Sequence, residues 1–176
     1  MHESYRYQHR SSERGLQRDR AAREKVLGAL AAHRQQLSQY RARIRNLTGV
    51  RNETVARAIG DGVRISTVAA AIGETIPRVR EIALAFEAAL AEERAFERPG
   101  PHSASRDEHL RSLRKIAEDL ASAVTGRASL EEQLGVLVTH AYRLGFTDET
   151  HLACMAGVSP ESVHQRLRGL RRLARG

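Results

Sequence analysis

Apolar side chains recur at steps of three and four residues along most of this chain, which is the spacing of helices that bury one face. Within residues 12–46 this pattern predicts one long helix with an apolar seam of about three heptads. The seam consists of Val26, Leu30, His33, Leu37, Tyr40, Ile44 and Leu47. Such a seam either packs on the domain that follows or pairs two chains as a coiled coil, and both interpretations stay open.

Shorter helical patterns follow, separated by residues that begin or end helices. Asn52 and Ser129 are suited to cap helix starts, and Gly126 and Gly145 are suited to end helices. The expected helices cover residues 53–59, 65–72, 76–98, 110–124, 130–141, 148–156 and 160–174. No stretch alternates convincingly with period two, so the sequence predicts an all-α fold.

One pattern, Ala-x-x-x-Gly-x-(Thr/Ser)-x-x-x-Val, occurs twice, 84 residues apart. Its members are Ala69, Gly73, Thr75 and Val79 in the first copy and Ala153, Gly157, Ser159 and Val163 in the second. The alanine fits where two helices touch, and the glycine allows a positive φ between them. The Thr or Ser caps the second helix, and the valine packs that helix onto the first. The two copies therefore predict two helix-turn-helix units.

A segment rich in Pro, Gly and Ser, RPGPHSASR, lies between the two copies and predicts a domain boundary. We expect a disordered basic tail at 1–11 and a first domain at 12–98. That domain would contain the long helix, the first helix-turn-helix unit and a connector helix. A linker at 99–106 and a second small helical domain at 107–176 complete the predicted organisation.

Charge adds a candidate partner to this picture. The formal net charge is +8, and of the 29 basic residues only Lys25 and Lys115 are lysines. The remaining arginines suit bidentate contacts to phosphate and to guanine. Because residues 1–50 carry much of the excess, a basic N-terminal arm and a basic last helix would attract nucleic acid at long range.

Composition argues against several other classes of protein. Aromatic residues make up only 4% and Trp is absent, which favours small helical bundles with Leu, Ile, Val and Ala cores over an enzyme with a large pocket. His140, His151 and His164 lack metal-ligand spacing, so no metal site, cofactor or catalytic residue is predicted. Because Cys154 is the only cysteine, an intrachain disulfide is not possible. Without a signal peptide or an apolar span, a soluble cytoplasmic protein is expected, with no membrane partner.

The second copy, LACMAGVSPESVHQRL, resembles the helix-turn-helix superfamily of bacterial and phage DNA-binding regulators. With the tail LRGLRRLAR it looks like the C-terminal promoter-reading helices of sigma factors and related response regulators. The first copy, STVAAAIGETIPRVREIAL, resembles the same superfamily. It departs from the usual pattern by Glu74, where an apolar residue is common, and by Pro77 in the first turn of the second helix.

The resemblance implies that the second helix of each unit enters the major groove of double-stranded DNA. In the first unit the residues expected to face DNA are Thr75, Ile76, Arg78, Arg80 and Glu81. In the second unit they are Ser159, Glu161, Ser162, His164, Gln165 and Arg168, with Arg171 and Arg172 placed for phosphate. Arg78 or Arg80 could bind guanine, and Glu81 could accept a hydrogen bond from cytosine. Gln165 could pair with adenine.

We therefore expect a sequence-specific DNA-binding transcriptional regulator, a repressor that binds an extended bipartite site with two helix-turn-helix units and is not an enzyme. Two alternatives remain open at this stage. One is a sigma-like transcription factor, with RNA polymerase as partner. The other is an oligomeric DNA-binding assembly protein that resembles a phage small terminase subunit. A homodimer through the 26–47 seam would instead favour a palindromic site.

Overall fold

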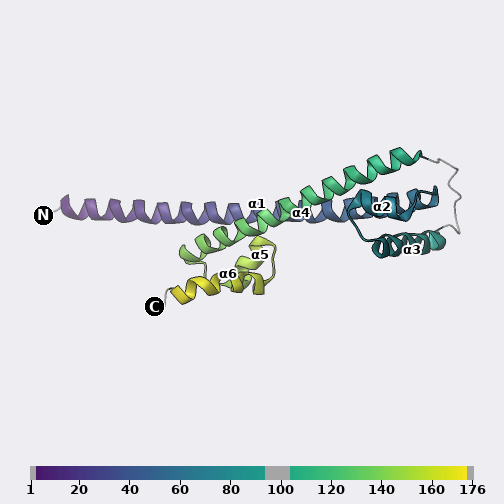
Figure 1. Ribbon diagram of the computed structural model, residues 1–176. Helices are drawn as coiled ribbons and strands as arrows, with labels where there is room; N and C mark the ends of the chain where they lie inside the picture. The colour runs from purple at the N-terminus through teal and green to yellow at the C-terminus, as the bar shows by residue number, and fades with distance from the viewer. Residues whose placement is uncertain (1–2, 94–103, 174–176) are drawn as a thin grey trace. The chain divides into compact units, whose positions relative to one another are not determined.

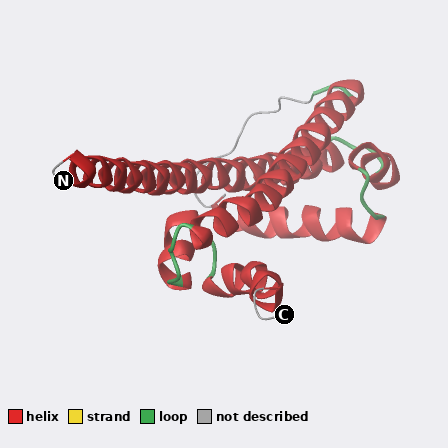
Figure 2. Ribbon diagram, turned by 90° about the vertical axis from the view of Figure 1, so that its left-hand side faces the viewer, coloured by secondary structure: helices red, strands yellow, loops and turns green. Residues whose placement is uncertain are grey.

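The computed structural model describes the backbone of residues 3–93 and 104–173, and the side chains of residues 15–88 and 104–168. Over these residues it contains six α-helices and no strand, which confirms the predicted all-α class. Figures 1 and 2 show this helical fold. The helices are α1 (Glu3–Gly60), α2 (Ile65–Ile72), α3 (Ile76–Glu93), α4 (Arg106–Arg143), α5 (Glu149–Ala156) and α6 (Pro160–Leu173). We call α2 and α3 the first helix pair, and α5 and α6 the second.

The chain forms two compact units, one of which is inserted in the sequence of the other. Unit 1 contains residues 1–39 and 127–176, and unit 2 contains residues 40–126. Helices α1 and α4 each contribute to both units, whereas each helix pair belongs to one. Most of the linker expected at 99–106 lies outside the described residues, so the predicted domain boundary stays a prediction.

Helix α1 is longer than the sequence predicted at both ends. It begins at Glu3, within the segment that we expected to be disordered, and it continues through Asn52 to Gly60. Asn52 lies inside α1 and caps no new helix, and its Oδ1 accepts hydrogen bonds from the Arg51 Nε and Nη2, at 3.3 and 3.1 Å. Extending an existing helix needs no new nucleus, so a favourable N-cap residue does not by itself create a break.

Helix α4 likewise runs through two residues that were expected to separate helices. Gly126 does not end a helix and Ser129 does not begin one, since both lie inside α4. A Cβ atom built at Gly126 would lie 2.6 Å from Cε1 of Tyr40. Gly126 therefore allows the ring of Tyr40, on α1, to approach the backbone of α4 within unit 2.

The core of unit 2 draws on all four of its helical segments. Val55 and Ala58 come from α1, Val68 and Ala69 from α2, Val79 and Ile82 from α3, and Leu110 and Leu113 from α4. A polar contact also joins α4 to the turn after α1, because His109 Nε2 lies 2.7 Å from Asp61 Oδ2. The first helix pair thus buries its apolar face against both long helices.

The core of unit 1 contains part of the apolar seam. Val26 and Leu30 of the seam join a buried cluster with Leu134 and Val138 of α4 and with residues of the second helix pair. His33 is also buried, and its Nε2 lies 2.7 Å from the Leu130 carbonyl oxygen of α4. This part of the seam is therefore covered by the chain's own helices.

We expect Gly126→Ala and Gly135→Ala to differ in stability, although both lie in α4. At Gly135 a Cβ meets nothing within 4 Å, so alanine should stabilise by about 0.5–1 kcal/mol through helix propensity. At Gly126 the Tyr40 ring must move, which should cancel that gain. Urea unfolding measures the free energy of unfolding of both variants. In a Tyr40→Ala background, Gly126→Ala should stabilise the protein as much as Gly135→Ala does. Equal stabilities for the two single variants would contradict the close approach.

Acid should weaken the start of α4. Glu108 accepts from the backbone N and the hydroxyl of Ser105, at 2.8 and 2.9 Å, and these bonds lower the pKa of Glu108 below its ordinary value of 4.5. The stabilisation is present above that value and is lost as the pH falls through the lower folded-state pKa. Unfolding measured between about pH 6 and about pH 3 should show a smaller acid loss for Glu108→Gln. Ser105→Ala should fall between the wild type and Glu108→Gln, because the backbone N–H of residue 105 still donates to the carboxylate. An unchanged profile in Glu108→Gln would exclude this contribution.

Candidate nucleic-acid interface

Within each helix pair, a turn joins the two helices, and the two turns have the same geometry. Gly73 and Gly157 both adopt a left-handed conformation with φ of 69°, which a side chain would strain. The following backbone N–H returns to the alanine of the repeated pattern, from Glu74 to Ala69 and from Val158 to Ala153, at 3.1 Å in each case. The sequence repeat at an offset of 84 therefore corresponds to a repeated structure.

The other members of the repeat also do what the sequence predicted. The Thr75 hydroxyl accepts a hydrogen bond from the Arg78 backbone N at 3.4 Å, and the Ser159 hydroxyl accepts one from Ser162 N at 3.3 Å. Each second helix is thus capped by its Thr or Ser. The pattern's alanines and valines are buried, namely Ala69, Ala153, Val79 and Val163. The starts of α3 and α6 are therefore fixed in orientation by equivalent contacts.

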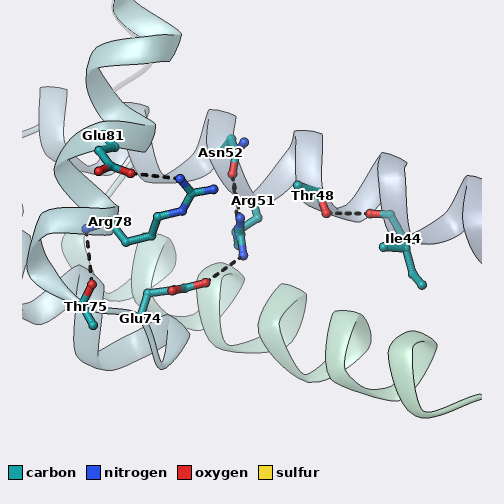
Figure 3. Close-up of polar contacts among 8 residues, drawn as sticks. All are labelled: Ile44, Thr48, Arg51, Asn52, Glu74, Thr75, Arg78 and Glu81. Carbon is teal, nitrogen blue, oxygen red and sulfur yellow. Dashed lines mark hydrogen bonds and ion pairs between the residues drawn. The ribbon is translucent and has the colours of Figure 1, made fainter. Parts of the chain in front are cut away.

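An arginine of α1 forms an ion pair with the turn of the first pair. Arg51 Nη1 lies 3.3 Å from Glu74 Oε1, and the Arg51 side chain is only 11% exposed (Figure 3). This ion pair gives a physical reason for Glu74, which stands where the family pattern has an apolar residue. Sequence reasoning missed the pair because no local periodicity connects residues 23 positions apart.

A second arginine of α1 contacts the turn of the second pair within unit 1. Arg34 Nη1 donates to the Cys154 carbonyl oxygen at 3.1 Å, and a Cβ at Gly157 would lie 2.7 Å from Arg34 Cγ. Arg23 Nε donates to the Leu144 carbonyl oxygen at 3.0 Å. Arg23 and Arg34 thus bind carbonyl groups near helix ends.

All five residues predicted in the first pair lie on the surface: Thr75, Ile76, Arg78, Arg80 and Glu81. Arg78 Nη1 pairs with Glu81 Oε2 at 3.0 Å, and Figure 3 shows the guanidinium turned toward that carboxylate. Arg80 has no hydrogen bond or ion pair with any other described residue. It lies four residues after Ile76 and four before Leu84, and both of these apolar side chains are exposed. We call Ile76, Arg80 and Leu84 the α3 stripe, since this spacing places them on one helix face.

The residues predicted in the second pair are also accessible, but several are already engaged. Ser159, Glu161, His164, Gln165 and Arg168 are exposed, and Ser162 is half-buried. Gln165 Nε2 donates to Glu161 Oε1 at 3.1 Å, and His164 Nδ1 lies 3.1 Å from Glu149 Oε2. The side chains of Arg171 and Arg172 lie outside the described residues, so their predicted phosphate contacts stay predictions.

Equivalent positions of the two pairs carry different charge. The exposed Arg64 precedes α2 and makes no capping bond with its side chain, whereas its counterpart Asp148 caps α5 by accepting from Thr150 N and His151 N. At two further positions the first pair has arginine where the second has Ser or His, namely Arg78 against Ser162 and Arg80 against His164. Among the described side chains, the first pair therefore presents more positive charge. Sequence reasoning singled out neither Arg64 nor Leu84.

Comparison with protein-family models, with curated proteins and with solved structures gave no match. The described part of the chain contains no group of three or more His, Cys, Asp or Glu residues arranged to hold a metal ion. Cys154 is exposed on α5. None of the described helices has both the length and the apolar character needed to cross a membrane.

A double-mutant cycle should show that the Arg51–Glu74 pair stabilises unit 2. We expect a coupling energy of about 1–2 kcal/mol, because Arg51 is largely buried and makes charge-assisted bonds. Arg43 and Asp119 form a matched control in the same unit, with Nη2 and Oδ1 3.7 Å apart and both side chains well exposed. Their coupling should stay below about 0.5 kcal/mol. If urea unfolding gives equal coupling energies for the two pairs, Glu74 does not have the structural role proposed for it.

Proposed function

We propose that the two helix pairs are helix-turn-helix units and that the protein is a sequence-specific double-stranded DNA-binding transcriptional regulator. In this proposal it acts as a repressor on a bipartite site. The observation that carries the proposal is the exposed start of α3, where Arg80 has no partner among the described residues. The turn at Gly73, the Thr75 cap and the buried Val79 hold that start in place. A helix held in this way can enter the major groove with its first turns leading.

The charge of the described residues supports a larger contribution from the first pair. Arg80 can donate two hydrogen bonds to O6 and N7 of guanine, which is the commonest specific contact in the major groove. Arg64, before α2, is placed for phosphate because its side chain caps no helix. Arg78 and Glu81 occupy one another in the free protein and would need to separate before either contacted a base. The second pair adds Gln165 and Arg168 as polar contacts.

The proposal takes a single chain as the unit that binds DNA. Val26 and Leu30 of the apolar seam fill the core of unit 1, so pairing two chains through them would require this core to open. A bipartite and asymmetric DNA site follows from two helix pairs that differ in sequence. No observation on the described residues favours a sigma-like factor or an oligomeric assembly protein.

Selection of bound duplexes from a random DNA pool tests the proposal directly. Arg80→Ala should then reduce discrimination at one G·C pair by about 1–3 kcal/mol, because one bidentate contact is lost. Arg64→Ala should weaken binding to all duplexes alike and lower the salt slope by about one unit. Lys115→Ala removes an exposed charge of unit 2 outside the helix pair and serves as the control. Failure to enrich any sequence would refute the proposed function.

A further inference from the structure

Two exposed apolar side chains flank Arg80 on the α3 stripe. Ile76 is 45% exposed and Leu84 is 59% exposed, although the opposite face of α3 buries Val79 and Ile82 in the core of unit 2. Ile76 is the first residue of α3, directly after the Thr75 cap. The end of the helix that would lead into the groove therefore carries an apolar group next to a cation.

The fold itself does not require an isoleucine at this position. The second pair has the same turn, the same cap and the same buried valine, yet its equivalent of Ile76 is Pro160, which is suited to the first turn of a helix, and its equivalent of Leu84 is Arg168. A β-branched residue on a helix surface also forms helix less readily than alanine. Ile76 is thus accounted for neither by the turn nor by the core of unit 2.

We propose that Ile76 is a specificity-determining residue that packs against the C5-methyl group of a thymine, beside the guanine bound by Arg80. This inference rests on the proposed function. Thymine presents the one apolar group among the base edges of the major groove, so an exposed aliphatic side chain there selects T·A pairs. Arg80, and Arg64 directly before α2, are exposed and provide the charge complementarity to a duplex, whereas Arg78 is paired with Glu81.

The test changes one methyl group on the DNA and one side chain on the protein. In the duplex preferred by the wild-type chain, each thymine is replaced in turn by deoxyuridine, which keeps the base pair and lacks the methyl. At one thymine the replacement should weaken wild-type binding about three- to ten-fold, as expected for losing one buried methyl contact. Ile76→Ala should lose a similar factor on the thymine duplex and be insensitive to deoxyuridine there.

Two further variants make the assignment specific. Val136→Ala removes an apolar side chain of α4 that is 72% exposed, and it should keep the full response to deoxyuridine. Leu84→Ala should likewise bind more weakly when that thymine is replaced by deoxyuridine. If Leu84→Ala is insensitive to the replacement and Ile76→Ala remains sensitive, the assignment to Ile76 is wrong.

The outcomes separate this inference from the proposed function. If the wild-type chain selects a sequence but no deoxyuridine replacement weakens its binding, the thymine contact is wrong and the DNA-binding function stands. If it selects no duplex sequence at all, both fail. Because the deoxyuridine series uses the unmodified protein, its result does not depend on whether a variant folds.

Discussion

Neither helix pair can bury its apolar face alone, and the rest of the structure follows from this constraint. The first helix of each pair has only eight residues, too few for a stable isolated helix. Each pair therefore packs on α1 and α4, through Val55 and Leu113 in unit 2 and through Leu30 and Leu134 in unit 1. The outer faces of α3 and α6 remain exposed because the inner faces are covered in this way.

Some arginines of this chain are held by other residues and others are not, and local sequence does not distinguish the two groups. Arg34 and Arg51 lie on α1 and bind a carbonyl oxygen and a carboxylate beside the turns of the helix pairs. Arg80 has the same side chain and no partner among the described residues. A high arginine content does not by itself indicate a binding surface, because tertiary contacts decide which arginines remain available to a partner.

Short-range chemistry made the helix pairs predictable from sequence. A glycine with positive φ, a Thr or Ser cap and a buried valine act within about ten residues, and the structure contains all of them where they were expected. The breaks expected at Asn52 and Gly126 were wrong, because packing between distant segments overrides local helix signals. Gly126 faces Tyr40, and no pattern in the sequence connects the two. The Arg51–Glu74 pair escaped prediction for the same reason.

Both units contain residues from each side of the segment 94–103, so a cut in that segment would divide both of them. A cut in that segment would leave Val26 and Leu30 on one fragment and Leu134 and Val138 of the same core on the other. Unit 2 would be divided likewise between Val79 and Leu113. Only the buried clusters and polar contacts such as His109 with Asp61 and Arg34 with Cys154 would then join the two fragments, so the segment 94–103 is the covalent connection between two halves of each core.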